Sequence, residues 1–208
     1  KRNILMGLIN PFVYYLVLFK AYSLLPAQEA QPLNYTWPIT ISIFAVIFLG
    51  QKLSLRTIIG LLLAFFGVWI IATRGDLFGL QFHNIYGVIL AVGSSLAWAA
   101  FWILNLKDQR DNSVKLFGAF SFGTVFTAIY ILFFDSFDFG EVEYLLGAVY
   151  IGLFEMGITF VLWLKALRLT ESTARVSTLI FFSPFLSLVF IRFLVGEVIL
   201  VSTIVGLI

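Results

Sequence analysis

Residues 34–52 read NYTWPITISIFAVIFLGQK. The stretch opens with polar and aromatic side chains around Pro38, continues as an apolar run, and closes on Gly50-Gln51-Lys52. An apolar α-helix of about twenty residues is long enough to cross the hydrocarbon core of a bilayer, and a proline inside it removes a backbone hydrogen bond. The stretch therefore predicts a membrane-spanning helix that is interrupted at Pro38.

The composition of the whole chain points the same way. With 61% hydrophobic and 12% charged residues and a mean hydropathy of +1.03, the chain has too few polar side chains to cover a soluble domain. Its long apolar runs favour α-helices over the shorter alternating strands of a membrane barrel. We therefore expect an all-α, polytopic membrane helical bundle. The basic residues lie between the apolar runs and indicate no nucleic-acid partner, and the absence of cysteine excludes thiolate metal sites.

Hydropathy divides the chain into seven complete spans and an apolar stub. The expected segments are roughly 4–22, 32–50, 56–73, 84–106, 116–134, 144–164 and 172–195, followed by the stub 198–208. The stub is too short to cross a bilayer, and the chain opens on Lys1 rather than on methionine. We therefore expect a fragment that is cut at both ends.

The basic residues in the short connectors predict the orientation of the chain. Ten of the thirteen lie on one face: Lys1, Arg2, Lys52, Arg56, Lys107, Arg110, Lys115, Lys165, Arg168 and Arg175. Only Lys20, Arg74 and Arg192 lie on the other. The first face is predicted to be cytoplasmic, which places the acidic connector with Asp135, Asp138, Glu141 and Glu143 outside.

The sequence also contains an internal repeat. Shifting it by 145 residues superposes Gly7, Leu8, Lys20, Ala21 and Leu24 on Gly152, Leu153, Lys165, Ala166 and Leu169. Shifting it by 146 residues superposes Leu33, Pro38, Phe44, Gly50, Thr57, Ile58, Gly60 and Leu61 on Leu179, Pro184, Phe190, Gly196, Thr203, Ile204, Gly206 and Leu207. Proline and glycine that align within aligned spans are stronger evidence of a repeat than matching apolar residues are.

The two copies are predicted to cross the bilayer in opposite directions. Each segment is separated from its copy by five spans, an odd number, and Lys52 on the inside corresponds to Val198 on the outside. Residues 1–76 then hold the last three helices of a first repeat, and residues 84–208 hold a second repeat with a truncated last helix. The intact protein is expected to have ten helices, of which two precede this chain.

These features resemble the drug/metabolite transporter superfamily, specifically its EamA-type permeases, which are built from two inverted five-helix repeats. Locally, the residues from Asn34 to Pro38 with Gly50-Gln51-Lys52 resemble aromatic amino-acid exporters of the YddG kind, although many EamA permeases have glutamate where this chain has Gln51. Pro184 and Gly196-Glu197 resemble the matching positions of the second repeat. The resemblance implies a substrate path between the two halves and export of amino acids or similar metabolites.

The repeated prolines suggest where a substrate would bind. Transporters built from repeats bind their cargo where helices are broken near the bilayer midplane, and Pro38 and Pro184 are such breaks. Around them lie Asn34, Tyr35 and Trp37 on one helix and Ser183 on its copy. Amide, hydroxyl and aromatic groups suit a zwitterion with a planar side chain. Alternatively, Tyr35 and Trp37 belong to an interfacial aromatic belt, and Asn34 is a hydrogen-bond partner between helices.

Three further residues complete the candidate site. Glu155 is an acidic residue within a span, and its repeat partner is Asn10. An exposed charge at that depth costs roughly 3 kcal/mol, which favours a position facing the bundle interior or water. Glu155 is a candidate to bind an ammonium group or to carry a coupling proton, or it is a protonated side chain that only joins helices.

Trp98 is a candidate to stack against a planar part of the cargo, or it forms a lipid-facing pair with Trp102. Gly87, Gly93, Gly118 and Gly123 are expected to allow close helix packing.

The sequence therefore predicts a secondary transporter that exports small metabolites by alternating access at the repeat interface. Amino acids are the predicted cargo. A multidrug or cationic-compound exporter is the alternative. An intramembrane enzyme is disfavoured because His83 is the sole histidine and lies in a connector, and a membrane scaffold would not use the paired prolines. We expect no cofactor, metal or nucleic-acid partner. The expected partners are a small-molecule substrate, the lipid of a bacterial inner membrane, and protons if transport is coupled to them.

Overall fold

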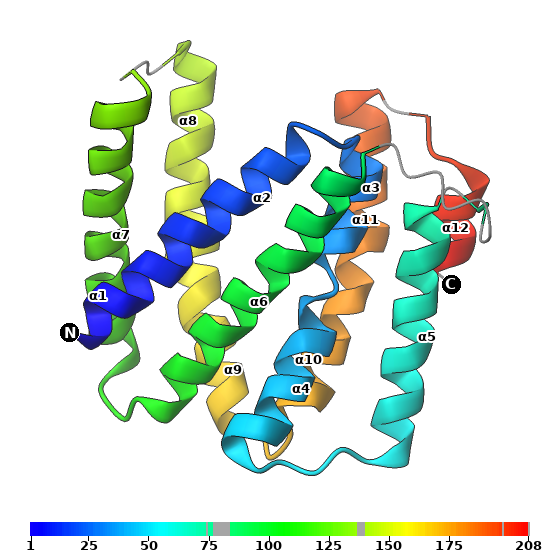
Figure 1. Ribbon diagram of the computed structural model, residues 1–208, viewed down its shortest axis with the longest axis horizontal. Coiled ribbons are helices and arrows are strands. Elements are labelled where there is room, and N and C mark those ends of the chain that lie inside the picture. Colours follow the sequence, from blue (N-terminus) through cyan, green and yellow to red (C-terminus); the bar gives the residue numbers. More distant parts are fainter. Residues whose placement is uncertain (74, 77–83, 137–139, 197, 208) are drawn as a thin grey trace. The chain divides into compact units, whose positions relative to one another are not determined.

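The computed structural model describes residues 1–73, 75–76, 84–136, 140–196 and 198–207. Regular structure in these ranges is helical (Figure 1). Within the described ranges, four stretches are long and apolar enough to cross a membrane: Arg2–Tyr22, Ile85–Lys107, Asn112–Phe134 and Val142–Leu169. Shorter apolar helices lie at Trp37–Leu49 and Leu55–Gly67. The predicted all-α membrane class is therefore confirmed. Arg74, His83, Asp138 and Glu197, which the sequence placed in connectors, lie outside the described residues.

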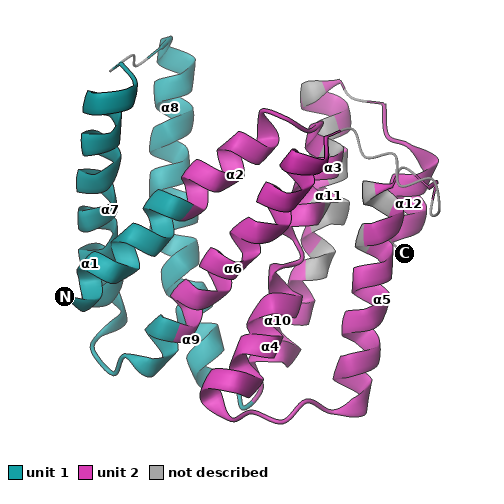
Figure 2. Cartoon of the chain, viewed as in Figure 1, with its two compact units in different colours: residues 1–13, 104–171 teal, residues 14–103, 172–208 magenta. Residues whose placement is uncertain are grey.

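The chain forms two compact units (Figure 2). Unit 1 comprises residues 1–13 and 104–171, and unit 2 comprises residues 14–103 and 172–208. Each unit takes segments from both halves of the sequence, so neither follows the boundaries 1–76 and 84–208. The assignment of those ranges to two repeats stays a prediction.

Unit 2 contains the broken helix that the opening stretch predicts. Helix α3 (Ala27–Asn34) ends at a turn of Tyr35 and Thr36, after which α4 (Trp37–Leu49) begins. Pro38 is the second residue of α4. The first amides of a helix have no intrahelical acceptor, so a proline without an N–H is tolerated there. Pro38 thus starts a new helix instead of kinking a continuous one.

The matching helix is interrupted more mildly, by a change of helical type and not by a turn. Helix α10 (Thr173–Ser177) continues as the 3₁₀ turn η3 (Thr178–Phe182), and α11 (Ser183–Phe190) then runs into the short helical turn η4 (Ile191–Val195). Pro184 is the second residue of α11, as Pro38 is of α4. The matching glycines both have left-handed backbones, with φ of 67° at Gly50 and 78° at Gly196. The matching glycines are thus alike in backbone conformation, as expected for the predicted repeat.

The two broken helices run in opposite directions within unit 2. Helix α4 packs against α10, whereas α3 packs against α11, so the first part of each helix meets the second part of the other (Figure 1). Helix α5 (Leu55–Ala72) packs against its own copy, α12 (Val201–Leu207). Helices α2 (Tyr14–Tyr22) and α6 (Ile85–Lys107) complete the unit up to Ile103. This antiparallel arrangement agrees with inverted copies.

Unit 1 is built around the contact between α1 (Arg2–Gly7) and α7 (Asn112–Phe134). It also contains the kinked stretch η1 (Leu8–Val13) and the continuous helix formed by α8 (Val142–Tyr150), the π-helical segment η2 (Ile151–Thr159) and α9 (Phe160–Leu169). A Cβ added at Gly7 would overlap the Ala119 carbonyl, and one at Gly123 would lie 2.5 Å from the Pro11 ring. Small residues thus allow these helices to approach closely.

The expectation for the other glycines is only partly met. A Cβ at Gly118 would collide with Asn3, and one at Gly87 would lie 2.8 Å from the Leu25 side chain. Gly93 differs, because a Cβ there would meet no atom within 4 Å. Among the described residues, no helix comes close enough to Gly93 to need a glycine there, so close helix packing at this position is not supported.

Candidate functional site

Asn34, at the end of α3, connects three helices of unit 2. Its side chain is buried, and its Nδ2 atom donates hydrogen bonds to Ser94 Oγ on α6 at 3.0 Å and to Tyr14 OH on α2 at 3.3 Å. Tyr14 OH in turn donates to Asn34 Oδ1 at 3.4 Å. The amide therefore links helices, as one of the two sequence interpretations proposed, and it does so beside the break at Tyr35.

Aromatic rings collect around Trp98 on α6. Its ring centroid lies 4.6 Å from that of Tyr14, 5.9 Å from that of Trp37 and 5.8 Å from that of Trp102. Trp37 is 5% exposed and Trp102 is fully buried. Trp37 therefore does not belong to an exposed interfacial belt, and Trp98 and Trp102 do not form a lipid-facing pair. The rings instead form a buried aromatic cluster next to Asn34.

The two helix breaks meet through hydroxyl groups. Tyr35 OH and Ser183 Oγ lie 2.9 Å apart, although the residues are separated by 148 positions in the sequence. Thr40, in the first turn of α4, shares a second hydroxyl contact of 2.8 Å with Ser95 on α6. Pro38 is buried beside this contact, while the side chain of Pro184 lies outside the described residues. The predicted neighbours of the two prolines are thus in direct contact.

Asn10 and Glu155 occupy equivalent irregular segments of unit 1 but differ in burial. Asn10 interrupts η1 with an extended backbone (φ −148°, ψ 122°), and its amide is fully buried with no hydrogen-bond partner among the described residues. Glu155 lies in η2 with its side chain exposed. Irregular helical turns of this kind are frequent at functional sites. The structure does not bring the two into one buried site, so their pairing stays a prediction.

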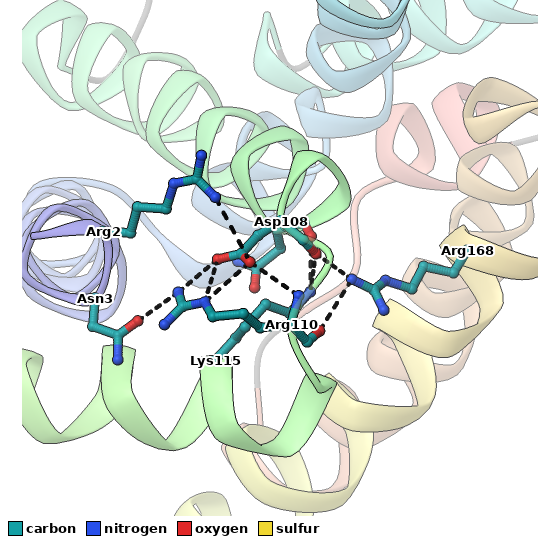
Figure 3. A network of polar contacts seen from close by, with 7 residues as sticks. Arg2, Asn3, Asp108, Arg110, Lys115 and Arg168 are labelled. Carbon is teal, nitrogen blue, oxygen red and sulfur yellow. Dashed lines mark hydrogen bonds and ion pairs between the residues drawn. The ribbon is translucent and has the colours of Figure 1, made fainter.

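A polar cluster that the sequence analysis missed surrounds Asp108, between α6 and α7 (Figure 3). The Asp108 carboxylate is buried and receives two bonds of 3.0 Å from Arg110 Nε, while Arg110 Nη2 also donates to Asn3 at 2.8 Å. Lys115 Nζ donates to the Asp108 carbonyl at 3.1 Å, and Arg168 donates to the same oxygen. The cluster joins the ends of α1, α6, α7 and α9 within unit 1.

The charges of this cluster lower the pKa of Asp108 to about 2, chiefly because Arg110 donates hydrogen bonds to the carboxylate. We expect Asp108→Asn to lower the free energy of unfolding by about 1–2 kcal/mol, the net loss of a charged hydrogen bond that is partly screened by solvent. Because the folded pKa lies below the ordinary 3.8, the difference should be present above pH 4 and should vanish as the pH falls towards 2. Thermal unfolding of both proteins across this range checks it, and a difference that grows with acidification would contradict it.

Comparison with known proteins identifies the fold's family. The model of the EamA-like transporter family matches residues 2–73 and 85–208. The chain belongs to the EamA-like transporter family. The resemblance inferred from the repeats and from residues 34–52 is therefore confirmed, and the chain is an integral membrane protein of a transporter family. Membership in this family favours transport over the intramembrane enzyme considered from the sequence.

Several known proteins are similar to this chain. The EamA-like chain is 24% identical over 205 residues to the uncharacterized transporter YvbV of Bacillus subtilis, covering 97% of this chain and 66% of that protein. It is 23% identical over 158 residues to the aromatic amino acid exporter YddG of Ancylobacter novellus, covering 76% and 55%. It is also 35% identical over 101 residues to the exporter of the same name in Escherichia coli, covering 44% and 33%.

A solved structure supports the fold. One crystal structure superposes on the EamA-like chain with a TM-score of 0.76, covering 98% of this chain and 71% of the other at 19% identity. At that identity the likeness concerns the fold alone. The chain spans about two-thirds of the length of the Bacillus subtilis relative and just over half of the Ancylobacter novellus one.

Proposed function

We propose that this EamA-like protein is a secondary transporter that exports small metabolites, with aromatic amino acids as the first candidates, by alternating access at the two helix breaks. The observation that carries the proposal is the meeting of Tyr35 and Ser183 at 2.9 Å, one from each broken helix, beside the buried aromatic cluster. Polar groups and flat rings are thus adjacent at a point where the backbone is irregular, as in other repeat-built carriers.

The helix ends at the breaks suit a carboxylate. Helices α4 and α11 both begin at the breaks, at Trp37 and Ser183, and they run away from each other in opposite directions. The N-terminal end of a helix carries the positive end of the helix dipole, which favours anionic groups. At α11 this dipole is the only contribution from Ser183's backbone, because its N–H already donates to the Ile180 carbonyl. The carboxylate of an amino acid would be stabilised there, while the hydroxyl groups of Tyr35 and Ser183 supply further hydrogen bonds.

The aromatic cluster suits a planar side chain. Trp98 is half-buried and lies between Tyr14 and Trp37, so one further ring could pack against the cluster edge. Aromatic rings stabilise one another in offset or edge-on arrangements by about 1 kcal/mol beyond their burial. Two relatives are named aromatic amino acid exporters, which supports this choice of cargo. Asn10 and Glu155 of unit 1 are proposed as transport residues in their own right, with Glu155 as the group that carries a coupling proton.

We place the protein in a bacterial cytoplasmic membrane with residues 1 and 2 on the cytoplasmic side, in keeping with the distribution of lysine and arginine. Residues 1–76 and 84–208 are proposed as parts of two inverted repeats. The partners would be a small-molecule substrate, lipid and protons, with no cofactor.

Counterflow in liposomes tests the cargo. Liposomes that contain the purified protein are loaded with one unlabelled compound and diluted into the same labelled compound, for a panel of aromatic, aliphatic and basic amino acids and lipophilic cations. We expect transient accumulation with phenylalanine, tyrosine or tryptophan and none with empty liposomes. Accumulation only with lipophilic cations would favour the multidrug alternative, for which Glu155 is the observation in support. No accumulation with any amino acid would contradict the proposed cargo.

A further inference from the structure

A pair of hydrogen bonds joins the two broken helices at one end. Gln51 follows Gly50, whose left-handed backbone ends α4. Its Oε1 atom accepts from the Thr173 backbone N–H at 3.1 Å, and its Nε2 atom donates to Thr173 Oγ1 at 3.1 Å. The two residues are separated by 122 positions in the sequence and both belong to unit 2. One side chain thus binds both polar groups of one residue on the other broken helix.

The chemistry of this contact requires an amide and a hydroxyl group. Thr173 is the first residue of α10, so its N–H has no acceptor within its own helix. The residue is also fully buried, so this N–H needs a partner from elsewhere in the protein. Gln51 supplies that acceptor, and its NH₂ group donates to the threonine oxygen at the same time. A carboxylate at position 51 would have no donor. The contact therefore explains glutamine at this position without any role for charge.

The contact lies at the end of the broken helices that the charges place on the cytoplasmic side. Lys52 and Arg56 follow Gln51, and Arg175 lies two residues after Thr173. We propose that Gln51 and Thr173 form a latch that closes the cytoplasmic end of the path between α4 and α10, and that this latch opens when cargo enters from the cytoplasm. The latch rests on the proposed transport function.

A buried hydroxyl lies behind this latch. Ser177 is four residues after Thr173 and therefore shares its face of α10. Its side chain is fully buried, and its Oγ has no hydrogen-bond partner among the described residues. A buried hydroxyl without a partner is costly unless water or another polar group reaches it in some state. Opening of the latch would expose Ser177 to the aqueous path.

The latch cannot be duplicated at the other end of the same helices. Helix α3, the copy of α10, begins at Ala27, which has no hydroxyl group. The residue at the first position of the copied helix therefore offers only its backbone N–H. The two ends of the path would accordingly be closed by different contacts, and loss of the Gln51 contact should affect one side only.

Cysteine labelling tests the latch directly, because the sequence contains no cysteine. Ser177→Cys is the reporter, and a membrane-impermeant maleimide is applied from the cytoplasmic or the external side of vesicles. We expect Gln51→Ala and Thr173→Val each to raise the cytoplasmic labelling rate about tenfold, the effect of losing one or two neutral hydrogen bonds. Thr173→Ser keeps both hydrogen bonds and should leave the rate unchanged.

A further control separates opening from general loss of stability. Asp108→Asn removes a contact of unit 1 and should not change labelling at position 177. Unchanged rates in both latch variants, or an increase from the external side, would overturn the latch. If one variant does not fold, the other decides the question. Labelling that responds as expected while counterflow fails for every cargo would leave the latch standing and reject the assigned cargo instead.

Discussion

Replacing Asn34 by alanine is expected to lower the initial rate of amino-acid counterflow, per folded protein, about tenfold or more. The change removes the hydrogen bonds that link α3 to Ser94 on α6 and to Tyr14 on α2, while Ser94 keeps its bond to the Ala91 carbonyl. Each such bond contributes about 1 kcal/mol, and a loss of 1.4 kcal/mol corresponds to a factor of ten in rate. The aromatic cluster beside Tyr14 would lose its fixed position at the same time.

A matched variant makes this prediction specific. Asn112→Ala also deletes an asparagine amide, but at the first position of α7 in unit 1. It should leave the counterflow rate within about twofold of the wild-type rate, because the half-buried Asn112 side chain has no hydrogen-bond partner for its amide oxygen among the described residues. Equal rates for Asn34→Ala and the wild-type protein would show that Asn34 only joins helices.

Replacing Glu155 by glutamine is expected to abolish the dependence of transport on pH. Glutamine has nearly the same shape and can still form hydrogen bonds, but it cannot release or accept a proton. Initial rates measured between pH 5.5 and 8.5 should vary for the wild-type protein and stay level for the variant. Ionisable groups within a membrane span are proton carriers in many transporters.

The control for this prediction is Glu171→Gln. Glu171 is exposed and lies outside the candidate spans, in the connector before α10. Its replacement should preserve the pH dependence. A pH dependence that persists in Glu155→Gln would remove the coupling role from this residue, although it would leave a role in binding cargo open to test by affinity.

The course of the helices was predictable from the sequence because the bilayer permits few structures. Backbone groups in hydrocarbon must be paired, so apolar runs of this length become helices. Pro38 and Gly50 marked the beginning and end of α4, and Pro184 and Gly196 marked the corresponding points of its copy. These residues act locally on the backbone, so their effect can be inferred without knowledge of their neighbours.

The contacts of the candidate site were less predictable because they depend on distant partners. The sequence indicated Asn34 and Trp98, but not that Tyr14 would contact both. The Asp108 cluster and the pair of Gln51 and Thr173 also join residues far apart in the chain. Only the Asp108-x-Arg110 spacing in a connector could have suggested a local ion pair. Residue type indicates what a side chain can bind, whereas only the fold decides what lies within reach.

If the two copies cross the membrane in opposite directions, Lys52 and Val198 must lie on opposite sides of it. Lys52→Cys and Val198→Cys would each be the sole cysteine of this chain, and both positions lie in connectors next to the ends of the broken helices. In sealed vesicles treated with an impermeant maleimide, we predict that the cysteine at position 52 reacts only from the cytoplasmic side and that at position 198 only from the external side. Reaction of both from the same side would contradict the inverted repeat.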